Sequence, residues 1–345
     1  MRARQINWGF LTWVALVNTT VAATTQSSVD PAGPQAQHIS QLWWVMLYLL
    51  TGVFILVMSL LSIGAFRRRS KAAETSGRNV IQTDSLRETK MARVVMGGVV
   101  VTTVILFALL VSSFIVGRTI YSTPKEPTVL TIDITGHQWW WDVRYENQVA
   151  SQIVTTANEI HIPVGRQVVF KLNSADVIHS FWVPNLHGKT DLIPGHPAET
   201  WLKADRTGVY RGQCAEFCGH QHAHMAFEVV VESEEQFQAW YESQLKSAPA
   251  QLTSSQSRGL QLFLSKPCVM CHTIQGTDAG GKVGPDLTHL ASRQTIAAGA
   301  LQNNRTNLSR WILNSQDVKP GNHMPPIPLN SEELNFVLDY LESLK

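Results

Sequence analysis

Cysteine is scarce in this chain of 345 residues: there are only four, in two close pairs, Cys214/Cys218 and Cys268/Cys271. Two tight pairs are too few for a disulfide scaffold and suit two separate cofactor sites. A strong excess of one charge is also lacking, because 28 Lys and Arg against 26 Asp and Glu leave a net charge of +2. This near neutrality argues against a nucleic-acid partner. No internal repeat is present, and the length allows two or three domains.

Charged residues are absent from two long stretches, residues 42–66 and 94–117. Each stretch exceeds the ~20 apolar residues that a helix needs to cross a bilayer, so both are predicted transmembrane spans. The alternative, a buried core helix, rarely runs this long without a charge. The connection between them holds eight Lys and Arg and three acidic residues, which predicts that it is cytoplasmic. Everything after Arg118 is then outside the cytoplasm.

The N-terminal segment, residues 1–23, predicts a secretory signal peptide. It begins with Arg2 and Arg4, continues through a short apolar run over 8–17, and ends on small residues at 21–23. A third span is a weaker alternative because the apolar run is short. Residues 24–40 are rich in Thr, Gln, Ser, Pro and Gly and predict a flexible exported tail. Residues 24–118 are therefore assigned to this tail and a two-helix transmembrane hairpin.

Beyond residue 118 the hydropathy pattern changes to the alternation typical of strands. The segments 129–135, 159–163, 167–172 and 226–231 alternate or are rich in β-branched residues, and turn residues separate them. This pattern predicts a small antiparallel β-sandwich or barrel over residues 119–232. Residues 233–256 predict a short amphipathic helix over 234–245 and a linker over 247–256.

The C-terminal residues, 257–345, are predicted to form an all-α domain. Asn330 and Glu333 are spaced as a capping pair at the start of a helix. One apolar stripe follows at helical spacing; its members are Leu334, Val337, Leu338, Leu341 and Leu344.

Soft metal ligands gather in the stretch Cys214-Ala-Glu-Phe-Cys218-Gly-His-Gln-His222-Ala-His-Met225. Thiolate, imidazole and thioether together select copper over hard cations. A disulfide with surface histidines is the alternative in an exported region, but it gives no role to His222 or Met225. A further histidine on a neighbouring strand would be needed. His179 stands at a strand-like position, although such a histidine is by itself more often an ordinary, partly buried one.

Residues 40–232 resemble subunit II of the haem–copper cytochrome c oxidases. The matching pieces are Gly-His-Gln-Trp-Trp-Trp over 136–141, Val-Ile-His-Ser-Phe-Trp-Val-Pro over 177–184, Lys-Thr-Asp-Leu-Ile-Pro-Gly over 189–195, and residues 208–225. The resemblance implies a cupredoxin domain that carries a binuclear copper A centre. It implies that Cys214 and Cys218 bridge both coppers, that His179 and Met225 complete one copper, and that His222 and the backbone carbonyl of Glu216 complete the other.

The same resemblance implies further roles around the centre. The Glu216 side chain would contribute to a Mg²⁺ or Mn²⁺ site shared with subunit I, and a carboxylate suits such a hard ion. Trp139 would mark the electron-entry surface over the copper, whereas any single Trp is otherwise expected in the core. Trp140 and His196 depart from the family, which usually has Tyr and Arg there. Three histidines have no matched ligand role: His187, His220 and His224.

The second cysteine pair lies in Cys268-Val-Met-Cys271-His272, the c-type haem attachment motif. The two thiols bond covalently to one haem and the adjacent histidine becomes an axial ligand. Zinc binding is the alternative, but no second Cys or His pair of zinc-ligand spacing follows.

The sixth haem ligand is predicted to be Met324, because it is the only methionine after the motif's own. Met/His ligation raises the haem potential into the electron-transfer range. His289 and His323 are rival ligands. Residues 257–345 thus resemble a class I cytochrome c, and the resemblance implies further roles: the carbonyl of Pro285 orients the axial histidine, and Arg293 and Trp311 hold the propionates.

A copper A domain followed by a cytochrome c domain resembles subunit II of the caa-type oxidases. The resemblance implies the electron-input subunit of a proton-pumping oxidase in a bacterial plasma (inner) membrane, with both cofactor domains on the periplasmic side. Its partners would be subunits I and III, membrane lipid, and a soluble cytochrome c as donor. Residues 119–240 contain 8 Lys and Arg and 14 Asp and Glu, a net charge of −6 that would attract a basic donor. The oxygen-reducing site would lie in subunit I.

Other functions remain open at this point. A nitric-oxide reductase subunit with copper A fits the same features. A nitrous-oxide reductase also carries copper A but lacks the membrane hairpin. A membrane-anchored copper-binding or copper-delivery protein would not need a haem, and a quinol oxidase subunit II would lack the copper ligands.

Overall fold

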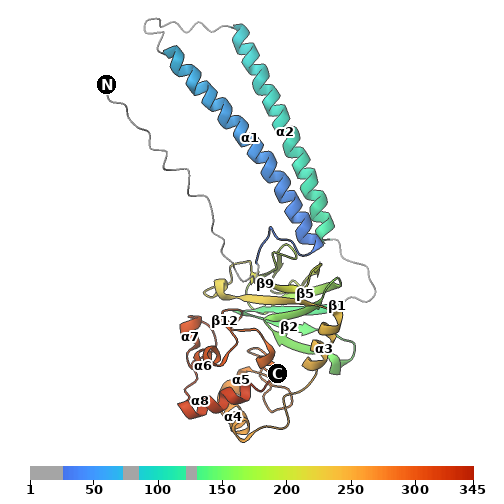
Figure 1. Cartoon of the computed structure of the whole chain (residues 1–345), viewed down its shortest axis with the longest axis vertical. Coiled ribbons are helices and arrows are strands. Elements are labelled where there is room, and N and C mark those ends of the chain that lie inside the picture. Colours follow the sequence, from blue (N-terminus) through green and yellow to red (C-terminus); the bar gives the residue numbers. More distant parts are fainter. Residues whose placement is uncertain (1–25, 73–84, 122–129) are drawn as a thin grey trace, which may run out of the picture.

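The fold was analysed in a computed structural model that describes residues 26–72, 85–121 and 130–345. Figure 1 shows three parts in succession: a helical hairpin at one end, a β-domain in the middle, and a helical domain at the other end. The predicted signal peptide at 1–23 lies outside the described residues, as do residues 73–84 of the connection between the predicted spans.

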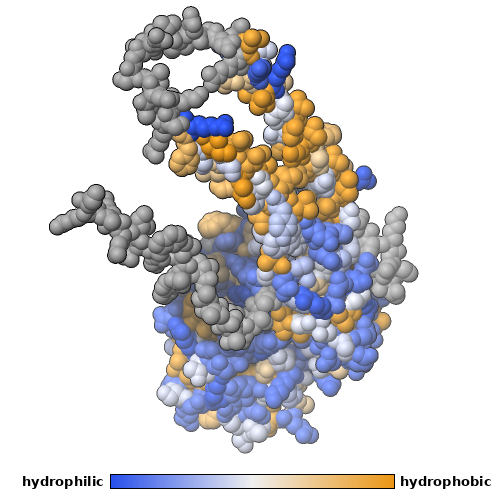
Figure 2. Space-filling model, turned by 45° about the horizontal axis from the view of Figure 1, so that its top comes forward, coloured by the Kyte–Doolittle hydropathy of each residue, from blue (hydrophilic) through white to orange (hydrophobic). Residues whose placement is uncertain are grey.

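The hairpin consists of α1 (Pro34–Ala72) and α2 (Ser85–Tyr121), which extend beyond the predicted spans at both ends. Both helices are long and apolar enough to cross a membrane, and none of the apolar window in either is buried within the chain. Figure 2 shows the resulting surface as largely hydrophobic. An exposed apolar surface of this size is characteristic of contact with a membrane or another protein.

The segment before α1 and the start of α1 itself pack on the β-domain, so the prediction of a flexible tail is wrong for residues 26–40. Ala32 and Ala36 are each only 2% exposed, and the Ala32 amide donates to the Asn185 carbonyl over 2.7 Å. A Cβ at Gly33 would lie 2.3 Å from the Lys203 carbonyl oxygen, so only glycine allows this approach. Composition indicated flexibility, but small residues here permit close backbone packing instead.

The β-domain is a sandwich of two five-stranded sheets, as predicted, but it is not antiparallel throughout. β1 pairs in parallel with β5, and β4 pairs in parallel with β10. Hydropathy alternation identifies a strand but carries no information on its direction, so the mixed topology was not accessible from the pattern. The first sheet has the order β3 (Val154–Ala157), β2 (Trp140–Tyr145), β1 (Leu130–His137), β5 (Gln167–Ser174), β8 (Ala198–Lys203); the second has the order β4 (Glu159–Pro163), β10 (Ala226–Glu232), β9 (Gly208–Cys214), β6 (His179–Trp182), β7 (Thr190–Leu192).

The core of this sandwich is built from the alternate, inward-facing residues of both sheets. Trp141 is completely buried and lies edge-on to Phe181 and Phe227, with ring centroids 6.1 and 5.2 Å away. Gly212 on β9 makes room for Phe227, because a Cβ there would lie 2.2 Å from the phenyl ring. The aromatic cluster thereby supports the strands β6, β9 and β10, which lead into the predicted copper ligands.

A short helix and a linker follow the sandwich. The predicted amphipathic helix is confirmed as α3 (Glu234–Gln244), and its Phe237 is buried against the sandwich. The predicted linker, 247–256, is too long at its C-terminal end, since α4 (Ser254–Ser265) already begins within it. Thr253 and Gln256 form a capping box, which starts the helix in a stretch that looked like linker by composition.

The C-terminal domain is helical, as predicted, with one small two-stranded sheet added. The capping pair of Asn330 and Glu333 is confirmed at the start of α8 (Ser331–Leu341), whose apolar stripe packs into the core. The remaining elements are α5 (Cys268–Cys271), η3 (Leu290–Ser292), β11 (Thr295–Ile296), β12 (Leu301–Gln302), α6 (Arg305–Leu313) and α7 (Ser315–Val318).

α4 and α8 cross at Gly259, which generates a prediction for stability. A Cβ at this position would lie 2.0 Å from the Phe336 carbonyl oxygen and 2.7 Å from Tyr340 Cβ. We expect Gly259→Ala to destabilise this domain by ~1–3 kcal/mol, because overpacking forces backbone shifts. Thermal unfolding of the full chain, followed by circular dichroism, measures the effect. Gly280→Ala is the matched control, since nothing lies within 4 Å of a Cβ there; equal melting temperatures would contradict the prediction.

Candidate copper and haem sites

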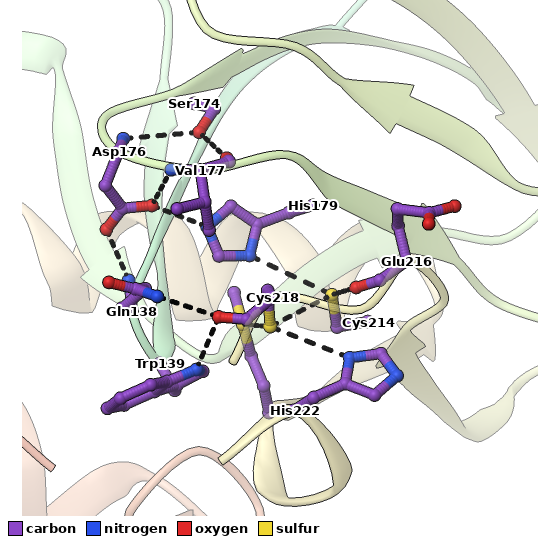
Figure 3. A network of polar contacts seen from close by, with 11 residues as sticks. Gln138, Trp139, Ser174, Asp176, Val177, His179, Cys214, Glu216, Cys218 and His222 are labelled. Atoms are coloured by element: carbon purple, nitrogen blue, oxygen red, sulfur yellow. Dashed lines mark hydrogen bonds and ion pairs between the residues drawn. The ribbon is translucent and has the colours of Figure 1, made fainter. Parts of the chain in front are cut away.

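The predicted copper ligands converge at one end of the sandwich (Figure 3). Cys214 ends β9, Cys218 lies in the following loop, and His222 begins the short helix η2 (His222–His224). Met225 directly precedes β10. His179 begins β6, and the pairing of β6 with β9 brings it beside Cys214. The sheet thus unites ligands that are up to 46 residues apart.

Short distances connect these donor atoms. The two sulfurs are 3.7 Å apart, well beyond the ~2.05 Å of a disulfide, and both cysteines are free. The structure therefore contradicts the alternative of a disulfide between Cys214 and Cys218. The other contacts are Cys214 Sγ to His179 Nδ1 at 3.9 Å, Cys218 Sγ to His222 Nδ1 at 3.6 Å, Cys218 Sγ to Met225 Sδ at 3.7 Å, and Cys214 Sγ to the Glu216 carbonyl oxygen at 3.2 Å.

The chemistry of this donor set fits a metal. The Glu216 carbonyl and the Met225 thioether have lone pairs and no hydrogen to donate, yet both face a buried thiol. The hydrogen bond between the two thiols lowers the pKa of Cys214 and raises that of Cys218, so Cys214 is the one that more readily becomes a thiolate, the form that binds metals. A bound cation satisfies all these electron-rich atoms at once. Sulfur and imidazole ligands indicate a soft metal such as copper.

Neighbouring residues hold the ligands in place. His179 Nε2 donates to Asp176 Oδ1 over 2.7 Å, which leaves Nδ1 as the nitrogen with a lone pair facing Cys214. Gly136 makes room for this ring, since a Cβ there would lie 2.8 Å from His179 Cδ2. The Cys218 carbonyl accepts from Trp139 Nε1 and from Gln138 Nε2. These supporting roles were not predicted from the sequence, although the position of Asp176 three residues before His179 was a signal.

Glu216 points its two polar groups in different directions. Its carbonyl faces the sulfurs, whereas its half-exposed carboxylate lies 3.4 Å from Lys189 Nζ. Among the described residues, only His179, Cys214 and Cys218 form a cluster of His, Cys and acidic side chains close enough to share an ion. The predicted Mg²⁺ or Mn²⁺ site stays a prediction that needs ligands from another chain.

A second site lies in the C-terminal domain, in a cavity of about 1500 Å³ that includes its open mouth. Its lining includes Cys268, Cys271, His272 and Met324, so the structure brings the four predicted haem-binding residues together. His272 Nδ1 donates to the Pro285 carbonyl over 2.8 Å, which confirms that predicted contact. The lone pair is then on Nε2, and burial lowers the pKa of the imidazole, which favours the neutral form that ligates iron.

One buried basic residue tests the fit of this cavity to a haem. Arg293 lines it and is 8% exposed, and its Nε has no hydrogen-bond partner among the described residues. A buried cation with a free donor suits an anionic group such as a haem propionate. The rival ligand His289 is occupied on both ring nitrogens, by the carbonyls of Lys345 and Gln244. Trp311 and the other rival, His323, both line the cavity.

The three consecutive tryptophans have three different environments. Trp141 belongs to the core of the sandwich, whereas Trp140 stacks on His137 and lines the haem cavity. Trp139 lies over the copper loop, residues 214–225, but is only 6% exposed, because the C-terminal domain covers it. In this chain the surface over the copper ligands therefore faces a second domain of the same chain.

Comparisons with known proteins agree with this geometry. The family "Cytochrome C oxidase subunit II, periplasmic domain" matches residues 147–233, and the family "Cytochrome c" matches residues 256–345. "Cytochrome c oxidase subunit 2" of Alkalihalophilus pseudofirmus is 34% identical over 326 residues, which cover 92% of this chain and 91% of that protein. The chain belongs to the cytochrome c oxidase subunit 2 family. It is accordingly a membrane-anchored subunit of a haem–copper oxidase.

Two further matches cover less of the chain. Cytochrome c oxidase subunit 2 of Bacillus sp. strain PS3 is 30% identical over 232 residues, covering 64% of each protein. The solved periplasmic domain of subunit II of cytochrome oxidase from Bradyrhizobium japonicum is 34% identical, with a TM-score of 0.33, and covers 36% of this chain and 96% of that one. Membership of the cytochrome c oxidase subunit 2 family implies assembly with other oxidase subunits, and the two matched domains imply copper A and haem.

The contact between Asp176 and His179 generates a prediction for metal affinity. Asp176→Asn removes the carboxylate that fixes the imidazole, and we expect copper affinity to fall ~10–100-fold, the usual cost of losing such a partner. Competition with a copper chelator, read by the copper absorbance of the full chain, measures this change. Asp205→Asn is a suitable control, because Asp205 is exposed on the same domain. An unchanged affinity in Asp176→Asn would show that packing alone orients His179.

Proposed function

We propose that this chain is the electron-input subunit of a bacterial cytochrome c oxidase that reduces dioxygen to water and pumps protons. In this proposal electrons from a soluble cytochrome c enter at the haem domain, continue to the copper centre, and leave for subunit I. The observation that carries the proposal is that one side chain, Trp139, contacts the copper loop and also lines the haem cavity.

The proposed ligands are the residues that the structure brings together. Covalent attachment to Cys268 and Cys271 with axial ligation by His272 and Met324 accounts for one haem c. For a binuclear copper A, Cys214 and Cys218 would bridge, His179 and Met225 would complete one copper, and His222 and the Glu216 carbonyl would complete the other. When bound, each of these groups supplies a carrier that accepts and releases a single electron.

The residues of the chain provide a rigid setting for such transfer. The copper ligands Cys214, Cys218 and Met225 are each at most 2% exposed, and strands of one sheet hold both ends of their loop. A buried and preorganised site excludes water and moves little when its charge changes. Trp139 joins this loop through its hydrogen bond to the Cys218 carbonyl over 2.9 Å, so the side chain between the two sites is also fixed.

The hairpin determines where in the cell the protein is located. We infer that α1 and α2 lie in the bacterial plasma membrane among its lipids, beside subunits I and III, with both cofactor domains on the periplasmic side. The charge asymmetry of the sequence supports this orientation. The exposed Glu216 carboxylate would then be available to a Mg²⁺ or Mn²⁺ site shared with subunit I.

Electron paramagnetic resonance of the copper-loaded full chain tests the copper assignment. One unpaired electron shared by two thiolate-bridged coppers gives hyperfine splitting from both nuclei, and this is the expected spectrum. Cys218→Ser should abolish it, because one bridging sulfur is lost. A spectrum from a single copper in the unaltered chain would refute the binuclear centre and, with it, this route for electrons.

Replacement of Trp139 tests the proposed connection between the sites. We expect Trp139→Phe to slow electron transfer from haem to copper, because the hydrogen bond to the Cys218 carbonyl is lost, while Gln138 keeps that carbonyl satisfied and copper content stays normal. Flash photoreduction of the haem, followed by copper absorbance, measures the rate. Trp240→Phe is the control, since Trp240 stacks on His161 away from the copper ligands. Loss of copper in Trp139→Phe would instead assign Trp139 a structural role.

A further inference from the structure

The segment Lys319–Met324, called here the haem-ligand loop because it ends on the proposed axial methionine, rests directly on the copper domain. Lys319 Nζ donates to the Trp139 carbonyl over 2.9 Å. Gln221 Nε2, from the copper loop, donates to the Pro320 carbonyl over 2.6 Å. The ring centroids of His323 and Trp139 are 5.3 Å apart. Both ligand loops thus meet in one interface.

We propose that Lys319 is a positioning residue, whose amino group fastens the haem-ligand loop to the backbone of Trp139 and so fixes the haem pocket against the copper loop. The proposal rests on the electron route given under Proposed function, which it deepens: it names the residue that sets the distance and orientation between the two sites.

The burial of Lys319 does not stabilise its own domain as well as an apolar side chain would, which indicates a role at the interface. The residue is 3% exposed, and its Nζ has two hydrogen-bond acceptors, the carbonyls of Trp139 and of Ala297 at 3.2 Å. Neither is a carboxylate, and burial lowers the pKa of this lysine to about 7 although the nearby Cys218 raises it in part. Burial of an amino group is costly, and an apolar side chain of the same length would stabilise the domain more.

The turn between β11 and β12 directs two backbone carbonyls, those of Ala297 and Ala298, toward the interface between the domains. Ala297 and Ala298 both have positive φ, 55° and 57°, a conformation that is uncommon for residues other than glycine. The Ala297 carbonyl accepts from Lys319, and the Ala298 carbonyl accepts from the amide of Ala226 in the copper domain over 3.0 Å. Two successive strained residues that each direct a carbonyl to the interface indicate that the turn is shaped for docking.

Two further hydrogen bonds connect the copper domain with residues that flank the β11–β12 turn. The Gln294 amide donates to Glu159 Oε2 over 2.8 Å, and Arg211 Nη1 donates to the Gly299 carbonyl over 3.4 Å. The amides of Ala226 and Gln294 therefore report on docking. Each becomes accessible to solvent when the two domains separate, whatever the state of the haem or the copper.

The test is Lys319→Met in the assembled oxidase with both cofactors bound. The variant loses the hydrogen bond that Lys319 donates across the interface to the Trp139 carbonyl, so we expect the docking equilibrium constant to fall about tenfold. Deuterium exchange at the Ala226 and Gln294 amides should accelerate by a similar factor, and electron transfer from haem to copper should slow. The absorption spectra of haem and copper should stay as in the unaltered protein. Lys319→Gln, which keeps an N–H donor group on a shorter side chain, should give intermediate values.

Lys246→Met, at an exposed lysine between the two domains, is the matched control and should change neither readout. The proposal is overturned if Lys319→Met leaves both amide exchange and the transfer rate unchanged. If this variant does not fold, Gln221→Ala, which removes the neighbouring contact to Pro320, decides the question by the same two readouts. An unaltered protein without any haem-to-copper transfer would refute the proposed function, while amide exchange would still test the docking role of Lys319.

Discussion

The hydrogen bond from Trp139 Nε1 to the Cys218 carbonyl lies within the copper domain, directly beneath the haem domain that covers Trp139. One end of it belongs to the copper loop, whose geometry depends on the pairing of β6 with β9. The other end belongs to a side chain that the haem-ligand loop covers through Lys319 and His323. Movement at either end would therefore disturb the ligands of one site and the docking of the other.

The features that could be predicted from the sequence are those coded by neighbouring residues. Two charge-free runs identified α1 and α2, and the Cys-Val-Met-Cys-His motif identified the haem pocket. The copper loop holds four side-chain ligands within twelve residues. The remaining side-chain ligand, His179, lies outside the loop and was decided only by the resemblance, because the strand pairing that brings it to Cys214 joins distant segments. The contact of Lys319 with Trp139, 180 residues apart, had no local signal at all.

The errors of prediction have related causes. Residues 26–40 were expected to be flexible because their composition is polar and rich in small residues, but the same small residues let Ala32 and Ala36 pack against the backbone of the sandwich. Alternation of hydropathy located the strands without revealing that two pairs are parallel. In both cases the deciding contact was with a distant segment, whose position depends on the complete fold.

The nine residues between α3 and α4, Leu245–Thr253, have a consequence for the strength of the domain interface. A connection this short keeps the haem domain near the copper loop at an effective concentration on the order of millimolar. Docking is then intramolecular, and a small patch of contacts suffices where two free proteins would need a large one. A diffusing donor at micromolar concentration would be outcompeted for Trp139 by the domain already attached, so it would have to deliver its electrons to that domain instead.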